Sequence, residues 1–291
     1  MKVLVALDGS KCSDAVLDHC LKCYWPEDTK FKVVSVVDFF EPLPALEAIK
    51  KGEIEKAQNI AEAGAARLME KFPSLSASFK VLDGYVKHQL IEAATEWPAD
   101  LIVVGSHGRT GFSKLLLGSV SQAIINHSPC SVRVVKTPEK KSEETFKVLI
   151  CLEDSKFSKK AFENLLNYQW PKNCSFSLCT VLYKLPENLS IPSSAMNSLE
   201  ERNTKQMISA EKLLESFEER LKDKFGKNTQ VEKVIKYGDA REELLAVIEE
   251  VRPELVLIGS HGRAIFDRML MGSVSEAVVS HADCPVEVVR I

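Results

Sequence analysis

Two glycine-rich segments carry the residue types best suited to binding an anion. The first runs GSHGRTGFSKLLLGSVS from Gly105, and the second returns as GSHGR at Gly259 and GSVS at Gly272. Both have the spacing Gly-x2-Gly-x9-Gly-Ser. Glycine lets backbone N–H groups approach an anion closely and can adopt a positive φ. The spacing therefore predicts a phosphate-binding loop in each half of the chain.

The Gly-Ser pair also predicts the start of a helix. Ser119 is the expected N-cap before the apolar run VSQAII. A helix N-terminus offers free N–H groups and a partial positive charge, and Arg109 adds a guanidinium that can donate two hydrogen bonds to a phosphate. The alternative is a purely structural glycine-rich turn with a capped helix, which a duplication would copy equally well.

The histidines between the glycines, His107 and His261, invite a catalytic interpretation. No serine or cysteine nucleophile with a complementary base can be assigned from the sequence, so we interpret both as polar loop residues. The other histidines show no metal-ligand spacing. The chain also lacks a Walker G-x-x-x-x-G-K-[ST] loop and an S-G-G-x-D-S pyrophosphatase loop. We therefore expect no catalytic residue and no metal held by protein side chains.

The elements that must position these loops alternate regularly. In the first half the apolar, β-branched runs KVLVAL, FKVVSVV, ASFKVL, DLIVVG and SVRVV alternate with segments of helical spacing. This order predicts right-handed βαβ units and a parallel sheet covered on both faces. Ligands bind at the carboxyl ends of such strands, and Gly105 ends the fourth. The predicted fold is α/β, with a doubly wound parallel sheet.

The second half repeats the first. KVLVALDGS from Lys2 returns as KVLICLEDS from Lys147, and the halves end alike in PCSVRVVK and CPVEVVRI. The polar stretch TPEKKSEET is the natural linker, so we expect domains at 1–138 and 146–291 joined by 139–145. The offset between copies grows from 145 at the first strand to 154 at the glycines. About nine extra residues are therefore expected in a loop around 185–200.

Composition narrows the class of protein. The formal net charge of −3 over 291 residues lacks the basic excess of a general nucleic-acid or anionic-membrane binder. No apolar stretch approaches the about 18 residues of a membrane span, and the opening run is too short for a signal peptide. Cys20 and Cys23 form a lone C-x-x-C among eight cysteines. We expect reduced thiols and a cytoplasmic protein.

Taken together, these motifs resemble the universal stress protein family. The glycine spacing, the opening VALDGS and the second strand VSVVD match the family pattern, and the resemblance covers essentially the whole chain, twice. It implies two tandem Rossmann-like domains of the adenine nucleotide alpha hydrolase-like kind. It also implies ATP, ADP or AMP as ligand, Mg²⁺ carried by the nucleotide, and a regulatory role in stress with little or no hydrolysis. The alternatives are an ATP-hydrolysing or adenylating enzyme of this fold, and a scaffold for a ligand other than a nucleotide.

The resemblance also implies which residues bind. Asp8 would lie beside the ribose and phosphates, and the backbone of Val36 would contact adenine, although Val36 is equally expected as a core residue. The ribose and phosphates would be surrounded by Gly105, Gly108, Arg109, Gly118, Ser119, Val120 and Ser121. The matching positions of the second half are Glu153, Val181, Gly259, Gly262, Arg263, Gly272, Ser273, Val274 and Ser275.

The second copy departs from the pattern at its first corner. Glu153 replaces the aspartate and adds one methylene of reach. Asp154 replaces the glycine, which adds a negative charge near the expected anion and restricts a turn that Gly9 leaves free. We therefore expect the first half to bind nucleotide more tightly than the second.

Each half ends in a short strand that would leave an unpaired sheet edge. The resemblance suggests that these last strands meet across a two-fold axis. We expect an intramolecular pseudo-dimer with Val132, Val134, Val286 and Val288 at or near the contact. A homodimer of whole chains can add to this contact, but folding does not require it.

Overall fold

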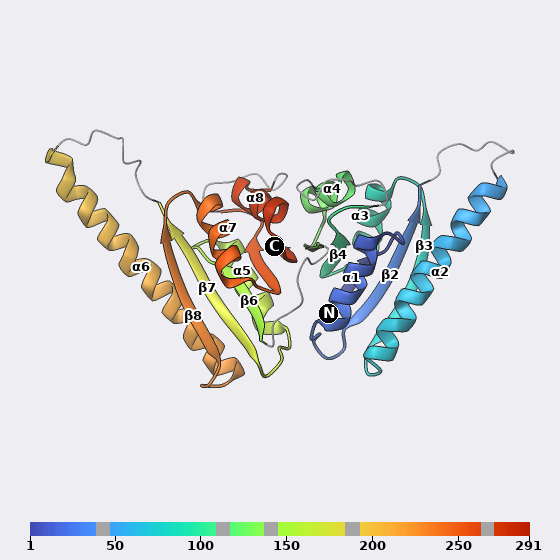
Figure 1. Cartoon of the computed structure of the whole chain (residues 1–291), viewed down its shortest axis with the longest axis horizontal. Helices are drawn as coiled ribbons and strands as arrows, with labels where there is room; N and C mark the ends of the chain where they lie inside the picture. Colours follow the sequence, from blue (N-terminus) through green and yellow to red (C-terminus); the bar gives the residue numbers. More distant parts are fainter. Residues whose placement is uncertain (39–46, 109–116, 137–144, 184–192, 263–270) are drawn as a thin grey trace.

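The computed structural model describes residues 1–38, 47–108, 117–136, 145–183, 193–262 and 271–291. Their strands form one ten-stranded sheet in the order β3-β2-β1-β4-β5-β10-β9-β6-β7-β8. The two halves lie side by side in this sheet, with the longest helix of each half on an outer flank (Figure 1). The expected tandem α/β architecture is confirmed.

The first half contains nine elements among its described residues, and its strands pair in parallel. They are β1 (Lys2–Ala6), α1 (Lys11–Lys22), β2 (Lys30–Val37), α2 (Glu47–Lys71), β3 (Ser76–Asp83), α3 (Val86–Glu96), β4 (Leu101–Gly105), α4 (Ser119–His127) and β5 (Ser131–Val135). The second half repeats the order with β6 (Phe146–Cys151), α5 (Lys156–Asn167), β7 (Cys174–Leu182), α6 (Ser193–Phe225), β8 (Gln230–Tyr237), α7 (Ala240–Val251), β9 (Leu255–Gly259), α8 (Ser273–His281) and β10 (Val286–Val289).

The extra residues of the second copy are helical where a loop was expected. Helix α6 has 33 residues, and its counterpart α2 has 25. The additional turns begin at Ser193, inside the segment assigned to a loop. A helix that extends beyond its sheet has no core to pack on along part of its length. The sequence of that part is polar and lacks the apolar periodicity that predicts a helix. The expected linker, 139–145, lies outside the described residues except for Thr145.

The central strands are buried because helices cover both faces of the sheet. One apolar cluster packs Val3, Val5 and their neighbours against α1, α2, α5 and α6. The other packs Leu4 and its neighbours against α3, α4, α7 and α8. Alternate strand residues point to opposite faces, so a strand buried on both reads as a continuous apolar run. The described helices include none with the length and apolarity needed to span a membrane.

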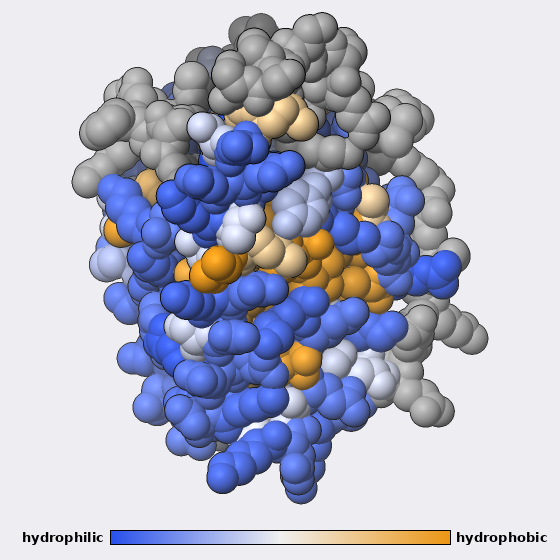
Figure 2. Space-filling view, turned by 90° about the vertical axis from the view of Figure 1, so that its left-hand side faces the viewer, coloured by the Kyte–Doolittle hydropathy of each residue, from blue (hydrophilic) through white to orange (hydrophobic). Residues whose placement is uncertain are grey.

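The last strands of the two halves pair antiparallel at the centre of the sheet. Val134 lies opposite Val286, and Val132 lies opposite Val288. These are the four valines expected at the contact, and all four are buried. The state of assembly in solution stays a prediction. The flank that carries α6 and β8 is mostly hydrophilic, with a smaller apolar area near its centre (Figure 2).

Candidate functional site

Helices α4 and α8 begin directly at the Gly-Ser pairs. The expected N-cap at Ser119 is wrong by one position, because Gly118 is the cap (φ −66°, ψ 152°) and Ser119 is the first helical residue. Gly272 caps α8 in the same way, and neither cap has a side-chain hydrogen bond. A helix whose first-turn N–H groups meet no capping side chain can offer those groups to an anion.

The caps are held against the ends of the neighbouring strands. The Gly118 N–H donates to the Ser106 carbonyl at 2.8 Å, and the Gly272 N–H donates to the Ser260 carbonyl at 2.9 Å. Ser121 adds a second tie, because its hydroxyl donates to the Gly105 carbonyl at 2.6 Å. The Ser275 hydroxyl donates likewise to Gly259 at 2.7 Å. The hydroxyls of Ser121 and Ser275 therefore fix each helix to its strand and are not free donors for a ligand.

The strand-ending glycines are required by close packing. A Cβ on Gly259 would lie 2.9 Å from the Cβ of Phe157, and one on Gly105 would lie 3.0 Å from the Cβ of Cys12. Either side chain would collide with the start of the helix that follows the first strand of that half. Glycine therefore lets the glycine loop and the first helix of each half converge on one point.

An acidic side chain meets the second glycine of each loop. A Cβ on Gly108 would lie 3.1 Å from Asp8 Oδ2, and one on Gly262 would lie 3.2 Å from Glu153 Oε1. The other oxygen of Asp8, Oδ1, accepts the Ser10 N–H at 3.0 Å. The extra methylene of Glu153 thus leaves its carboxylate beside the same glycine as in the first half.

The structure changes the expectation for Asp154. Its carboxylate pairs with Lys159 at 2.7 Å, and its side chain is 63% exposed, so its charge is partly neutralised. Gly9 has φ +76°, whereas the described non-glycine residues with positive φ are Asp28 and Arg252. Asp154 therefore does not adopt the turn of Gly9, and the second copy forms this corner with a different backbone conformation.

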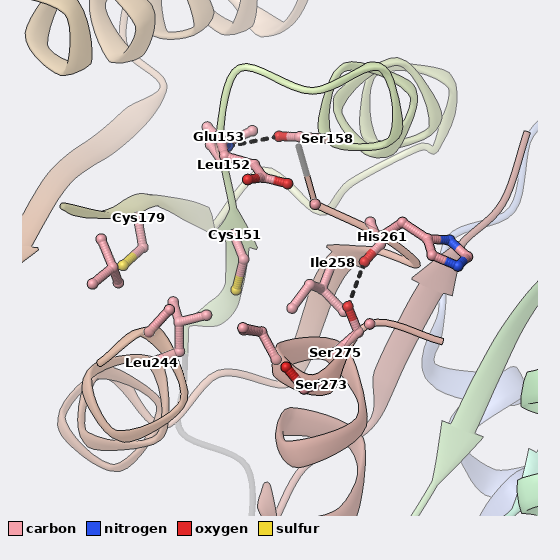
Figure 3. A pocket seen from close by; sticks show the side chains of 16 residues that line it. Cys151, Leu152, Glu153, Ser158, Cys179, Leu244, Ile258, His261, Ser273 and Ser275 are labelled. Carbon is pink, nitrogen blue, oxygen red and sulfur yellow. Dashed lines mark hydrogen bonds between the residues drawn. The ribbon is translucent and has the colours of Figure 1, made fainter. Parts of the chain in front are cut away.

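In the second half these residues line a cavity of about 410 Å³ (Figure 3). Of the expected second-half residues, Arg263 lies outside the described residues, as does its counterpart Arg109. The others all line the cavity, namely Glu153, Val181, Gly259, Gly262, Gly272, Ser273, Val274 and Ser275. The first half places its matching described residues at the same strand ends. Val36 and Val120 are also partly buried against the apolar cluster, as the alternative interpretation of Val36 anticipated.

The floor of the cavity is apolar, which the sequence motifs did not reveal. Cys151, Cys179, Leu244 and Ile258 line it beside Val181. Burial raises the pKa of Cys179 to about 12, and burial together with the nearby Cys179 raises the pKa of Cys151 well above its usual value. Both thiols stay neutral at physiological pH and act as small apolar groups. The alternation of strands β6 and β7 was the available signal, since it points these residues at one face.

The histidines of the loops are tied to their neighbours. Ser260 Oγ lies 3.0 Å from His261 Nδ1, and Ser106 Oγ lies 3.1 Å from His107 Nδ1. Both serines are buried, and so is His261. Its imidazole points away from the Cys179 and Leu244 side of the cavity (Figure 3). A hydroxyl enclosed in this way is out of reach of a substrate. Within the described residues no group of three or more His, Cys, Asp or Glu side chains could hold a metal.

Comparisons with known proteins identify the family of the chain. The model of the universal stress protein family matches residues 1–136 and 145–290. A universal stress protein of Mycolicibacterium smegmatis is 26% identical over 99% of this chain and 96% of its own. One from Methanocaldococcus jannaschii is 30% identical over 48% of this chain and 84% of its own. The crystal structure of a universal stress protein from Archaeoglobus fulgidus shares the fold, with a TM-score of 0.64 at 21% identity over 99% of this chain and 96% of that one. The chain therefore belongs to the universal stress protein family and carries the family's domain twice.

Proposed function

We propose that this protein binds an adenine nucleotide at the carboxyl ends of its strands and acts as a regulatory module with little or no hydrolysis. One observation carries the proposal. In the second half the start of α8, the glycine loop, an acidic side chain and an apolar floor all line one cavity of about 410 Å³. A nucleotide needs this combination, because it joins phosphates to a polar sugar and a planar base.

Each part of the cavity suits one part of the ligand. The N–H groups at the start of α8, from Ser273 onward, suit the phosphates. The Glu153 carboxylate can accept hydrogen bonds from the ribose hydroxyls. The neutral surface of Cys179, Val181 and Leu244 suits the base. Asp8 and the start of α4 would do the same in the first half.

The chemistry of the cavity favours binding over turnover. A hydrolytic site needs a base within reach of the attacking water, and a covalent one needs an accessible nucleophile. Ser260 and His261 bond to each other in a buried position. Glu153 is the acidic side chain at the cavity, and we assign it to the ribose. Mg²⁺ would arrive bound to the phosphates, and oxygens of the phosphates and of water would supply most of its ligands.

We further propose a reducing, cytoplasmic location. The structure holds all eight cysteines as free thiols, including Cys151 and Cys179, which are direct neighbours in the register of β6 and β7. Thiols so close to each other would be at risk of oxidation in a secreted protein.

Calorimetry on protein freed of bound nucleotide tests the proposal. ATP, ADP and AMP are titrated with and without Mg²⁺, and small molecules released from freshly purified protein are identified by mass spectrometry. We expect micromolar binding of at least one adenine nucleotide and no steady-state ATP turnover. Absence of binding by all three, with none released from the protein, would show that the cavity serves another ligand. Turnover abolished by Glu153→Gln would show an enzyme.

A further inference from the structure

The central pair of strands places two equivalent residues face to face. In the register of β5 and β10, Arg133 lies directly opposite Glu287. The two copies are offset by 154 residues here, so Arg133 and Glu287 hold the same position in their respective halves. The pseudo-two-fold axis of the sheet therefore passes between them. Any pairing of a half with a copy of itself through this strand would set Arg133 against Arg133, or Glu287 against Glu287.

These two side chains form a buried ion pair. Arg133 Nε and Nη2 donate to Glu287 Oε2 at 3.0 and 2.6 Å. The side chains are 2% and 0% exposed. The Tyr168 hydroxyl lies 3.0 Å from each carboxylate oxygen and donates to Glu287. The guanidinium packs against two aromatic rings, with the ring centres of Trp25 and Tyr168 5.3 and 5.2 Å from its carbon, and these two rings meet edge to face.

The residues around the pair are neutral. Burial and the neighbouring Arg133 charge hold the pKa of His19 well below its usual value. Burial raises the pKa of Cys23, and burial together with Glu287 raises that of Tyr168 well above its usual value. The cluster therefore contains one positive and one negative charge, which cancel. A second cation or a second anion in this place would have no counter-charge and no water.

Each charge of the pair has a hydrogen-bond partner from its own half, and the two partners differ in type. Cys23 and Tyr168 are equivalent residues, 145 positions apart, in the loops after α1 and α5. Cys23 accepts from Arg133 Nη1 at 3.3 Å, whereas Tyr168 donates to Glu287. A tyrosine hydroxyl is a better donor to a carboxylate than a thiol is. The tyrosine, which is the better donor, thus lies in the same half as the carboxylate that it donates to.

We propose that Arg133 and Glu287 make the last strand of each half a docking surface for the other half and exclude a second copy of the same half. Breaking a buried ion pair is strongly destabilising because it leaves a charge uncompensated, and a like-charged pair is worse. Complementary charges discriminate between partners by penalising the wrong one. The proposal concerns assembly, so it stands or falls independently of nucleotide binding.

The test uses the full chain with a cleavage site for a specific protease placed within 139–145. After cleavage, native mass spectrometry distinguishes the possible pairs, because the halves differ in mass. We expect the wild-type halves to remain together at micromolar concentration, with one copy of each half in every complex. Homodimers of either half at the level of random pairing, or halves that separate into monomers, would overturn the proposal.

Charge reversal supplies the decisive comparison. Arg133→Glu imitates a second-half homodimer, and Glu287→Arg imitates a first-half homodimer. Each should weaken association of the cleaved halves by at least about 100-fold. Mixing the first half from cleaved Arg133→Glu with the second half from cleaved Glu287→Arg restores opposite charges and should restore pairing. Failure to restore it would contradict the proposal. Lys205→Glu reverses a charge whose side chain is 79% exposed on α6 and should have no effect.

A neutral variant covers the case in which a charge reversal prevents folding. Arg133→Met combined with Glu287→Leu replaces the ion pair with apolar side chains of similar size, which proteins often tolerate. We expect this variant to fold and, after cleavage, to form homodimers of each half beside the mixed pair. Formation of the mixed pair alone would show that the charges do not select the partner.

Discussion

Lys136 of the first half donates from Nζ to the carbonyl of Ser280 at 2.8 Å, near the C-terminus of α8 in the second half. Arg290 is the equivalent residue of the second half and reaches the C-terminus of α4. It donates from Nη2 to the carbonyls of Ile125 at 2.7 Å and Asn126 at 2.6 Å, and from Nη1 to that of Ser128 at 2.9 Å. Each half thus supplies a cation at the C-terminus of the other half's helix that begins at the Gly-Ser pair.

This exchange of cations predicts unequal losses of stability. Arg290→Ala removes charged hydrogen bonds to three carbonyls and should lower the free energy of unfolding by about 2 kcal/mol. Lys136→Ala removes one and should cost about 1 kcal/mol. Thermal unfolding of the intact chain ranks the two variants. Equal shifts, or a larger shift for Lys136→Ala, would contradict the geometry.

The cap at Gly118 predicts a variant that folds without binding at the first site. Aspartate is a favourable N-cap, and a Cβ at Gly118 would lie 3.3 Å from the Ser106 carbonyl oxygen, so Gly118→Asp should keep α4 after a shift of a few tenths of an ångström in the loop. Its carboxylate would occupy the first-turn N–H groups and repel phosphate by about 1–4 kcal/mol at about 4 Å. The affinity of the first site for ATP should fall at least about tenfold, as calorimetry would show. Gly118→Asn has the same shape without the charge and should lose less.

The same substitution allows the two sites to be ranked within the whole chain. Gly272→Asp leaves the first site to be measured alone, and Gly118→Asp leaves the second. We expect the first site to bind ATP about fivefold more tightly, which corresponds to about 1 kcal/mol, because the turn at Gly9 has a backbone conformation that Asp154 does not adopt. Because Asp154 is paired with Lys159 and exposed, Asp154→Gly should change the second site less than twofold. Equal affinities, or the reverse order, would contradict the ranking.

The position of His19 predicts a stability that depends on pH. Its Nε2 lies 3.3 Å from Arg133 Nη1, and burial together with that charge lowers its pKa well below 6.5. Below about pH 6.5 the unfolded chain binds a proton that the folded chain refuses, so stability falls as the pH falls, by up to about 1.4 kcal/mol per pH unit. His19→Gln should flatten this slope between pH 6.5 and 5. His88→Gln, at an exposed position, serves as the matched control.

Much of the architecture follows from local sequence, and the exceptions have physical causes. The alternation of strands and helices was predicted correctly, because the spacing of apolar residues and the turn residues between segments are local signals. The N-cap was misplaced because glycine and serine both favour that position, and only backbone angles separate them. Asp154 was judged by its charge, but Lys159 lies one helical turn away and pairs with it.

The contact between the two halves could also be predicted only in part from the sequence. The alternating valines of the last strands were visible in the sequence. The pairing of Arg133 with Glu287 depends on the register between strands 154 residues apart, which no local pattern reports. Read alone, each residue is a single charge within an apolar run. The floor of the cavity was missed for a similar reason, since Cys151 of β6 and Leu244 of α7 line one cavity only in the folded protein.

Helices α4 and α8 have a consequence for communication between the two loops. The Ser260 N–H, in the second loop, donates to the carbonyl of Val289 at 2.9 Å. The next residue, Arg290, donates hydrogen bonds to carbonyls at the C-terminus of α4. The N-terminus of the same helix is the cap at Gly118, in the first loop. The route from one loop to the other therefore consists of one peptide unit, one side chain and a helix of nine residues. The equivalent connection runs from the first loop to the second. The Ser106 N–H, in the first loop, donates to the carbonyl of Val135 at 2.8 Å, and the next residue, Lys136, donates to the C-terminus of α8. A shift of either helix along its axis would therefore act on a side chain rooted beside the opposite loop.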